Sequence, residues 1–283
     1  MSAFPNYLIN GSNESLSPLD RGFAYGDGVF RTLPIHHGKP GCWALHYNKL
    51  INDCKMLGII CPEESLLLSD IEKLFGSFGS LVEPQAVAKI IITRGIGERG
   101  YTLPQPAIPS RIVIKSNFPN YNADNIINGV KLHLCVTRLG LQPKLAGVKH
   151  LNRLENVLAR MEWQDHGIAD GLMLDTNGHV IECTTSNVFA RFGNKLVTPN
   201  LSECGVAGVT RQRIIEAAPD VGLLSVVQKI TLAELLQADE VIICNSLFGA
   251  WQVVGLDNKV WLNNGSTQKL AQDLRKILQV SCD

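Results

Sequence analysis

The chain has 283 residues, of which 45% are hydrophobic and 18% are charged. Lysine plus arginine and aspartate plus glutamate each number 26, so the formal net charge is zero. This length allows one large domain or two smaller ones, each with its own core. A chain without excess positive charge has no general attraction for nucleic acid or an anionic membrane, so neither is expected as a partner.

The eight cysteines show no paired C-x-x-C spacing, and several lie in apolar runs. This pattern is typical of reduced, packed thiols rather than a zinc site, so no metal is expected. The first ten residues lack the basic and apolar regions of a secretion signal. No apolar run has the length that spans a bilayer. We therefore expect a cytoplasmic protein that binds a small molecule.

Residues 1–117 are predicted to form a smaller N-terminal α/β domain. Alternating or β-branched runs predict strands at 7–9, 29–36, 86–93 and 111–116. Apolar residues at helical spacing predict one helix at 44–57, ended by Gly58, and a second from Glu64 to Phe78. The glycine-rich run at 20–28 predicts a loop.

Residues 118–129 are polar and rich in turn formers, and predict a loop between two domains. The remainder, 130–283, is predicted to form a larger C-terminal domain. Its strands are expected at 130–138, 171–175, 179–182, 187–192, 195–198, 240–244 and 251–254. Its helices are expected at 149–166, from Gly208, from the capping box of Thr231 and Glu234, and at 267–278. The fold class expected is α/β (α+β) with two domains.

Lys149 is predicted to lie in the first turn of an amphipathic helix. The apolar face of this helix would consist of Leu151, Leu154, Val157, Leu158 and Met161. The positive end of the helix dipole would favour the neutral amine, which is the form that Schiff-base chemistry needs. A solvated surface lysine is the alternative, and this segment alone favours it.

Three other groups could bind a ligand that carries a ring nitrogen and a phosphate. Glu182 could hold a buried protonated nitrogen while its hydroxyl-bearing neighbours donate hydrogen bonds, or it could cap a turn. Val209 and Thr210, after Gly208, could bind phosphate at a helix N-terminus or form an ordinary N-cap. Asn245 and Ser246 follow an apolar strand and could contact the same anion. Together with a lysine nucleophile, these groups are what pyridoxal phosphate requires.

The order of these residues resembles the class IV aminotransferase family, whose members have the two-domain fold of D-amino-acid and branched-chain aminotransferases (pyridoxal-phosphate fold type IV). The segments that carry this resemblance are Tyr25–Phe30, Thr93–Gly95, Lys149, Glu182–Phe189 and Gly208–Arg211. Within the family, the runs Gly97–Tyr101, Leu145–Glu155 and Gln237–Glu240 are similar to the aminodeoxychorismate lyases. The resemblance extends over nearly the whole chain.

The resemblance implies pyridoxal 5′-phosphate as the cofactor. Lys149 would carry the cofactor covalently and move a proton, and Glu182 would bond its pyridine nitrogen. Its phosphate would be held by Val209, Thr210, Asn245 and Ser246. Lys49 matches the position of a phosphate-binding arginine in the family. Lysine keeps the charge but lacks the planar bidentate fork, so weaker or wetter anchoring is expected.

The resemblance also places Arg94 and Arg99 near a dicarboxylate substrate, although either could be a surface arginine. Thr32 matches a hydroxyl that faces the cofactor and would protonate the departing enol; otherwise it is an ordinary strand residue. The implied reaction converts 4-amino-4-deoxychorismate into 4-aminobenzoate and pyruvate, in a homodimer. A D-amino-acid or branched-chain aminotransferase and a non-enzymatic α/β protein are the alternatives.

Overall fold

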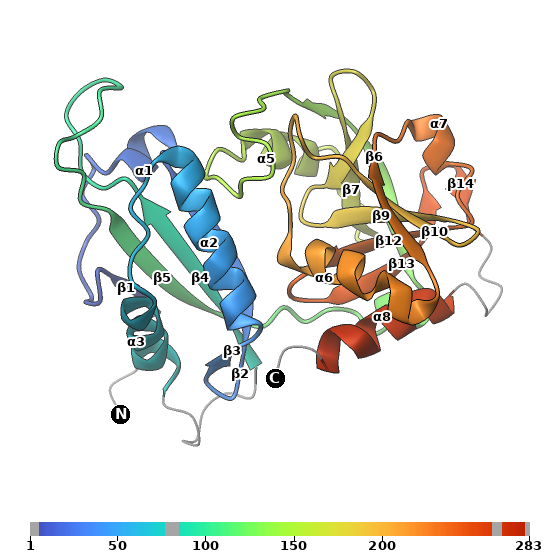
Figure 1. The fold of residues 1–283 in the computed structure, drawn as a ribbon, viewed down its shortest axis with the longest axis horizontal. Coiled ribbons are helices and arrows are strands. Elements are labelled where there is room, and N and C mark those ends of the chain that lie inside the picture. The colour runs from blue at the N-terminus through green and yellow to red at the C-terminus, as the bar shows by residue number, and fades with distance from the viewer. Residues whose placement is uncertain (1–5, 77–84, 262–267, 281–283) are drawn as a thin grey trace. The chain divides into compact units, whose positions relative to one another are not determined.

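The computed structural model describes residues 6–76, 85–261 and 268–280 (Figure 1). The chain divides into two compact units. The first ends at Pro119 and also contains Val148–Asn152, and the second contains Asn120–Gly147 and the chain from Arg153 onward. Lys149 therefore belongs to the first unit, although the sequence placed it in the C-terminal domain. The predicted helix limits Phe78 and Thr267 lie outside the described residues.

The first unit is built on a five-stranded antiparallel sheet in the order β1-β5-β4-β2-β3. Its strands are β1 (Tyr7–Ile9), β2 (Gly28–His36), β3 (Lys39–Pro40), β4 (Gln85–Thr93) and β5 (Ser110–Asn117). The helices α2 (Trp43–Leu57) and α3 (Glu64–Phe75) pack their buried residues into one core with β2, β4 and β5 (Figure 1). A short helix, α1 (Arg21–Tyr25), replaces part of the predicted glycine-rich loop because the Asp20 side chain caps it.

The two faces of β2 differ in burial, as period-two alternation requires. Val29, Leu33 and Ile35 are buried in the core beneath α2. Phe30 and Thr32 alternate with them and are half-buried on the opposite face. Because one face is closed by helices, only the other face of this strand can present side chains to a ligand.

The second unit contains a nine-stranded sheet in the order β11-β10-β9-β12-β13-β6-β7-β8, with β14 paired to β13. The strands are β6 (Val130–Leu139), β7 (Ile168–Asp175), β8 (Val180–Cys183), β9 (Asn187–Phe192), β10 (Lys195–Pro199), β11 (Leu224–Gln228), β12 (Glu240–Asn245), β13 (Gly249–Leu256) and β14 (Lys259–Val260). The helices are α4 (Asp124–Ile127), α5 (Leu154–Arg160), α6 (Val209–Ala217), η1 (Ala218–Val221), α7 (Leu232–Leu235) and α8 (Gln268–Val280).

Successive residues of the central strands enter two different cores. Val188 and Val241 join a cluster that also contains residues of β8 and β10, so strands from both ends of the sheet share it and the sheet must curl. Phe189 and Ile242 point to the other face and pack against α6 and α8. This explains why β9 and β12 read as continuous apolar runs, since both faces are covered.

The prediction of a helix over 149–166 is wrong. Residues 149–153 are not helical, and α5 covers only Leu154–Arg160. Its expected core-facing residues are exposed: Leu154 by 69%, Val157 by 54%, Leu158 by 48% and Met161 by 67%. The helix instead buries Ala159 against β6 and β7. The dipole argument for Lys149 therefore fails, because the lysine precedes the helix by five residues.

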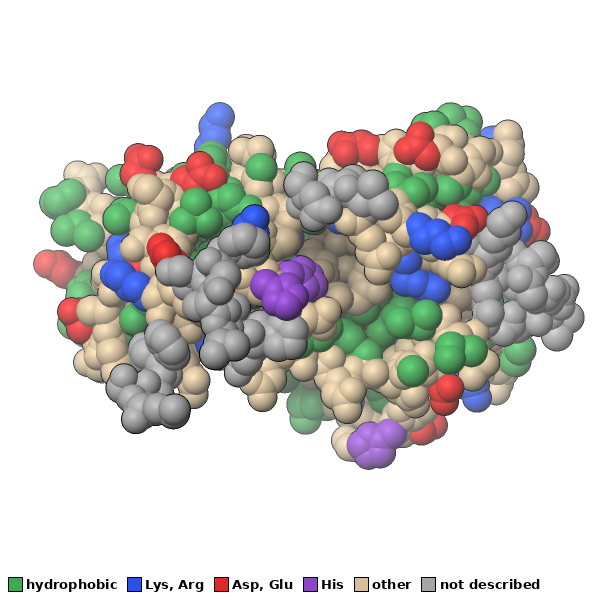
Figure 2. Space-filling model, turned by 90° about the horizontal axis from the view of Figure 1, so that it is seen from below, with side chains coloured by type: hydrophobic (Ala, Val, Ile, Leu, Met, Phe, Trp, Pro, Cys, Tyr) green, Lys and Arg blue, Asp and Glu red, His purple; other side chains and the backbone are tan. Residues whose placement is uncertain are grey.

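On the face drawn in Figure 2, basic and acidic side chains are interspersed rather than gathered by sign. None of the helices in the described ranges has the length and hydropathy needed to cross a membrane. The same residues contain no cluster of His, Cys, Asp or Glu suited to a metal ion. Six cysteines (Cys54, Cys61, Cys135, Cys183, Cys204 and Cys244) are free thiols.

Candidate functional site

Lys149 is held by its backbone against the first residues of β2. Its carbonyl accepts a hydrogen bond from Phe30 N at 2.9 Å, and Leu151 N donates to Gly28 O at 2.9 Å. His150 forms an antiparallel bridge with Val29 between these two bonds. The side-chain amine extends over the Phe30 ring, with Nζ 4.6 Å from its centroid. The predicted nucleophile therefore lies on the face of β2 that the helices leave uncovered.

A buried carboxylate fixes this lysine from the other side of the strand. Asp53, on α2, is 1% exposed and accepts a hydrogen bond from Lys149 N at 3.2 Å. The same carboxylate forms ion pairs with Arg31 and with Lys49. Burial lowers the pKa of Lys49, and the neighbouring Asp53 charge partly opposes that shift. Lys49 is thus a half-buried cation that already forms an ion pair with the carboxylate bonded to the Lys149 backbone.

Thr32 lies on the same face of β2 as Phe30, and a second lysine lies beside it. Lys89 pairs in register with Thr32 across β2 and β4. Its amine is 5.0 Å from the centroid of the Phe30 ring. The uncovered face of the first unit therefore carries two lysine amines and a hydroxyl around one aromatic ring.

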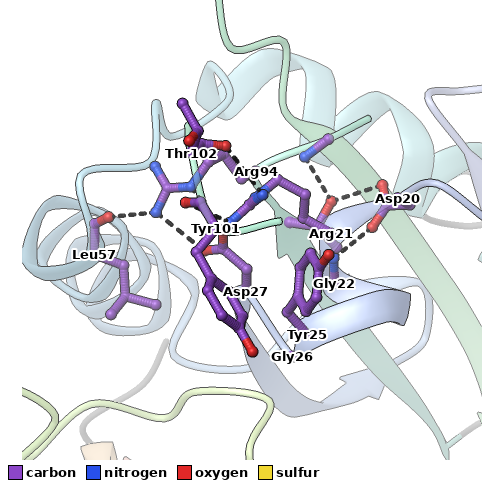
Figure 3. A network of polar contacts seen from close by, with 12 residues as sticks. Asp20, Arg21, Gly22, Tyr25, Gly26, Asp27, Leu57, Arg94, Tyr101 and Thr102 are labelled. Atoms are coloured by element: carbon purple, nitrogen blue, oxygen red, sulfur yellow. Dashed lines mark hydrogen bonds and ion pairs between the residues drawn. The ribbon is translucent and has the colours of Figure 1, made fainter. Parts of the chain in front are cut away.

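Arg94 is part of a structural network rather than an open anion site (Figure 3). It is 6% exposed and binds Asp27 through Nε at 2.8 Å and Nη2 at 3.0 Å. The same guanidinium donates to Leu57 O at 2.7 Å and Gly58 O at 2.8 Å. Burial raises the pKa of Asp27, but the bonds from Arg94 and Arg21 outweigh this and lower it. The described donors of Arg94 are directed at groups inside the first unit, and its substrate role stays a prediction.

The lyase-like run Gly97–Tyr101 is fixed by the same network. Arg21, buried within it, donates to Gly100 O at 3.1 Å and Thr102 O at 3.3 Å (Figure 3). Tyr25 accepts from Gly100 N at 3.2 Å and packs against Tyr101, with ring centroids 5.4 Å apart. Arg99 lies exposed in this anchored loop, where its substrate role stays a prediction.

In the second unit, Glu182 is buried near the end of β8 and is 4% exposed. Its Oε2 accepts a hydrogen bond from Val206 N at 2.8 Å. Gly205, just before this amide, has φ +86°, and a Cβ there would lie 2.7 Å from Ile181. Only glycine fits both the conformation and the space at this position. The turn that places the Val206 amide beside Glu182 therefore depends on Gly205.

The N-terminus of α6 is held by Asn187. Its amide donates to Val206 O at 2.8 Å and accepts from Gly208 N at 3.2 Å. The Thr210 hydroxyl, in the first turn, lies 3.4 Å from the Ser246 hydroxyl. The structure thus brings together the helix N-terminus and Ser246, as the sequence expected. N–H groups in a first helical turn have no intrahelical acceptor and suit an anion.

Asn245 is the last residue of β12 and shapes the turn that follows it. Its Oδ1 accepts from Leu247 N at 2.9 Å and Phe248 N at 3.0 Å, which forms a turn after β12. Its Nδ2 donates to Thr185 O at 3.4 Å. The side chain therefore shapes the loop that carries Ser246, and a direct phosphate contact stays a prediction.

The hydroxyls that follow Glu182 bind a different carboxylate. Asp170, 3% exposed, accepts from Thr184 Oγ1 at 2.5 Å, Thr185 Oγ1 at 2.8 Å and Ser186 Oγ at 2.8 Å. The expectation that these neighbours donate to Glu182 is corrected by this geometry. Asp170 fixes the loop, because its one carboxylate accepts hydrogen bonds from three consecutive hydroxyls.

Sequence reasoning missed Asp53, Lys89 and Asp170. Asp53 stands four residues after Lys49, a spacing that places two side chains on one helix face. Lys89 could have been found by aligning the alternation of two predicted strands. Asp170 gives no local signal, because its partners lie 14 to 16 residues later.

The two units therefore contain the chemical groups that the sequence analysis expects of a class IV aminotransferase. The sequence pattern of class IV aminotransferases (Amino-transferase class IV) matches residues 28–256, and the chain belongs to that family. The predictions of family and of the two-domain α/β fold are confirmed.

Three similar proteins show which members of the family this chain resembles. Aminodeoxychorismate lyase of Vibrio harveyi is 37% identical over 258 residues, covering 90% of this chain and 93% of that protein. The structure of 4-amino-4-deoxychorismate lyase from Pseudomonas aeruginosa matches with a TM-score of 0.88 at 42% identity, covering 95% of this chain and 98% of that one. A putative branched-chain-amino-acid aminotransferase of Methanocaldococcus jannaschii is 26% identical over 269 residues, covering 95% and 92%.

Proposed function

We propose that this protein converts 4-amino-4-deoxychorismate into 4-aminobenzoate and pyruvate with pyridoxal 5′-phosphate as cofactor. The observation that carries the proposal is the likeness over nearly the full chain to two proteins named as lyases of this substrate, at 37% and 42% identity. The identity to the aminotransferase relative is lower, at 26%. The product 4-aminobenzoate is a precursor in folate biosynthesis, which would place the reaction in that pathway.

The residues present in each unit fit this cofactor. The first unit supplies the Lys149 amine and the half-buried Lys49 cation. The second supplies the buried Glu182 carboxylate and the α6 N-terminus with Thr210 and Ser246. A Cβ at Gly208 would lie 2.4 Å from Asn187 Oδ1, so the glycine leaves room for the side chain that holds the start of this helix. A bound pyridoxal phosphate would supply an electron-accepting ring.

Within the proposed site, Lys149 would carry the cofactor and remove the proton from the substrate carbon that bears the amine. Glu182 would keep the ring nitrogen protonated, and Val209, Thr210, Ser246, Asn245 and Lys49 would surround the phosphate. Thr32, on the same face of β2 as Phe30, would give a proton to the departing enol. Lys89 and Arg99 are the cations we propose for the two substrate carboxylates. Arg94 would act through the loop that Asp27 and Arg21 anchor.

A parallel activity assay separates this proposal from the aminotransferase alternative. The purified, cofactor-loaded protein is given aminodeoxychorismate in one reaction, and D- or branched-chain amino acids with 2-oxo acids in another. We expect equal amounts of 4-aminobenzoate and pyruvate in the first reaction and little amino transfer in the second. Fast amino transfer without 4-aminobenzoate would support the aminotransferase and overturn the proposal.

We further propose that the protein works as a homodimer in the cytoplasm. The exposed apolar residues of α5 support an interface, because contiguous apolar surface on a folded protein usually marks a contact. In the first unit, Phe23 (74%), Tyr101 (83%) and Ile108 (74%) are also exposed. Such large apolar side chains are typical of the centres of subunit interfaces.

A further inference from the structure

Two free thiols lie next to one another at the end of α2. Cys54 is fully buried in the core of the first unit, and Cys61 is half-buried and packs against the same cluster. Each thiol shifts the pKa of the other, as expected for sulfur atoms that pack in the same cluster. No activity proposed above uses either sulfur atom.

The backbone reverses direction between the two cysteines and brings Cys61 back towards Cys54. Gly58, at φ 64°, ends α2 in the left-handed conformation, and Ile59 N then donates to Cys54 O at 2.8 Å. This helix-ending motif turns the chain back over the last turn of the helix. Beyond Cys61, Pro62 O accepts from Tyr47 Oη at 3.1 Å. Hydrogen bonds therefore connect the chain to α2 both before and after Cys61.

We propose that Cys54 and Cys61 form a reversible thiol redox pair, in which Cys61 is oxidised by a small peroxide and Cys54 then closes the disulfide. In the first step, the Cys61 sulfur attacks the peroxide, an S–O bond forms, the O–O bond breaks, and the other oxygen leaves as water after protonation. In the second step, the Cys54 sulfur attacks Cys61, an S–S bond forms, and the hydroxyl leaves as water with the Cys54 proton. The peroxide is reduced to two molecules of water.

The pKa values of the two thiols differ in the direction that this order of steps requires. The hydrogen bond from Cys54 lowers the pKa of Cys61, against the opposing effects of burial and of the Glu63 charge. The same contact, with burial, raises the pKa of Cys54. The thiolate is the reactive form, so the more exposed cysteine is also the better first nucleophile. Redox-sensing cysteines typically combine a lowered pKa, access to solvent and a neighbouring thiol.

The full-length protein is treated with hydrogen peroxide, remaining thiols are blocked, and the unreduced protein is digested with trypsin. Cleavage after Lys49, Lys55 and Lys73 places each cysteine in a separate peptide, 50–55 and 56–73. We expect these peptides to be joined, with the loss of two hydrogen atoms, and to separate again after dithiothreitol. Peptide 196–211, which contains Cys204, is an internal control: its thiol is 7% exposed, and burial raises its pKa to about 12.

We expect the joined peptide to form about tenfold faster than any oxidation of Cys204. The Cys54→Ala variant should accumulate a sulfenic acid at Cys61 that dimedone traps, and the Cys61→Ala variant should leave Cys54 unmodified. Equal oxidation of Cys61 and Cys204 in the unaltered protein would overturn the proposal. So would conversion of Cys61 to sulfinic acid without the joined peptide. These last two results require no variant to fold.

Discussion

At the scale of single residues, the lysine proposed to carry the cofactor owes its position to backbone contacts. Lys149 is fixed by β2 on one side and by the Asp53 carboxylate on the other. Asp53 also pairs with Arg31 and Lys49, so one buried carboxylate connects a cation proposed for the phosphate with the lysine proposed for the chemistry. A change at Asp53 should therefore affect both stability and function.

The Asp53→Asn substitution should destabilise the protein by about 3 kcal/mol, because the buried Arg31 guanidinium loses its carboxylate partner. Denaturant unfolding measures this difference. The double substitution Asp53→Leu with Arg31→Met removes this buried pair and should recover part of the loss, since Lys49 still loses its carboxylate partner. Equal stability of the single and double variants would show that the pair does not behave as a buried ion pair.

Thr32 is half-buried on the face of β2 that carries Phe30. If its hydroxyl donates the proton to the departing enol, Thr32→Ala should lower kcat about 100-fold, the lower range for loss of a general acid. Thr32→Ser keeps a hydroxyl and should retain most of the turnover. Steady-state release of 4-aminobenzoate gives both values, and full turnover by the alanine variant would exclude this role.

At the scale of elements, strands were easier to predict from sequence than the helix near Lys149. Strands β4 and β12 were predicted within a residue or two because alternation and apolar runs are local signals. The helix over 149–166 was wrong because residues 149–151 pair with β2, a contact between segments more than a hundred residues apart. Its apolar periodicity is real, but it lies on the surface. Periodicity identifies an apolar face and does not say what covers it.

A contact between Glu162 and β6 makes the stability of the protein depend on pH. Glu162, after α5, accepts from Val136 N at 2.6 Å and Thr137 N at 2.8 Å, where the register of β6 with β7 shifts. Burial opposes its ionisation, but bonds from Thr137, Val136 and His133 outweigh it and lower the pKa of Glu162 from 4.5 to about 2. A carboxyl with a lowered pKa in the folded state contributes stability above pH 4.5 and loses that contribution as the pH falls towards 2.

The Glu162→Gln variant should therefore be less stable than the unaltered protein at pH 7, by about 2 kcal/mol. The difference should shrink between pH 4.5 and 2, as the native carboxyl takes up its proton. Urea unfolding over this pH range provides the test. A difference that stays constant with pH would mean that the charge of Glu162 does not hold β6.

At the scale of the whole molecule, the residues proposed for one reaction are divided between two units. Lys149, Lys49 and Thr32 belong to the first, and Glu182 and Thr210 to the second. Motif order along the chain suggests these residues, because each lies in a short recognisable run, and their roles stay predictions. The hydrogen bonds of Arg94 could not be predicted, since they depend on Asp27 and on carbonyls at the end of α2.

The proposed homodimer can be tested through α5. Replacing Val157 and Met161 by glutamate puts two charges on its exposed apolar face and should weaken dimerisation at least about tenfold, which corresponds to about 1.4 kcal/mol. Sedimentation across a range of concentrations measures the change. Val260→Glu, at a residue that is 65% exposed on β14, is the matched control and should leave the dimer intact. A monomeric unaltered protein at every concentration would refute the dimer.

The proposed chemistry depends on Lys149 as the residue that carries the cofactor. Borohydride reduction of the cofactor-loaded protein should fix the cofactor on its amine. Trypsin does not cleave after a modified lysine, so digestion should then yield peptide 145–153 intact, with the added mass on Lys149. A label on Lys49 or Lys89, or no label on a protein that takes up no pyridoxal phosphate, would contradict the assignment.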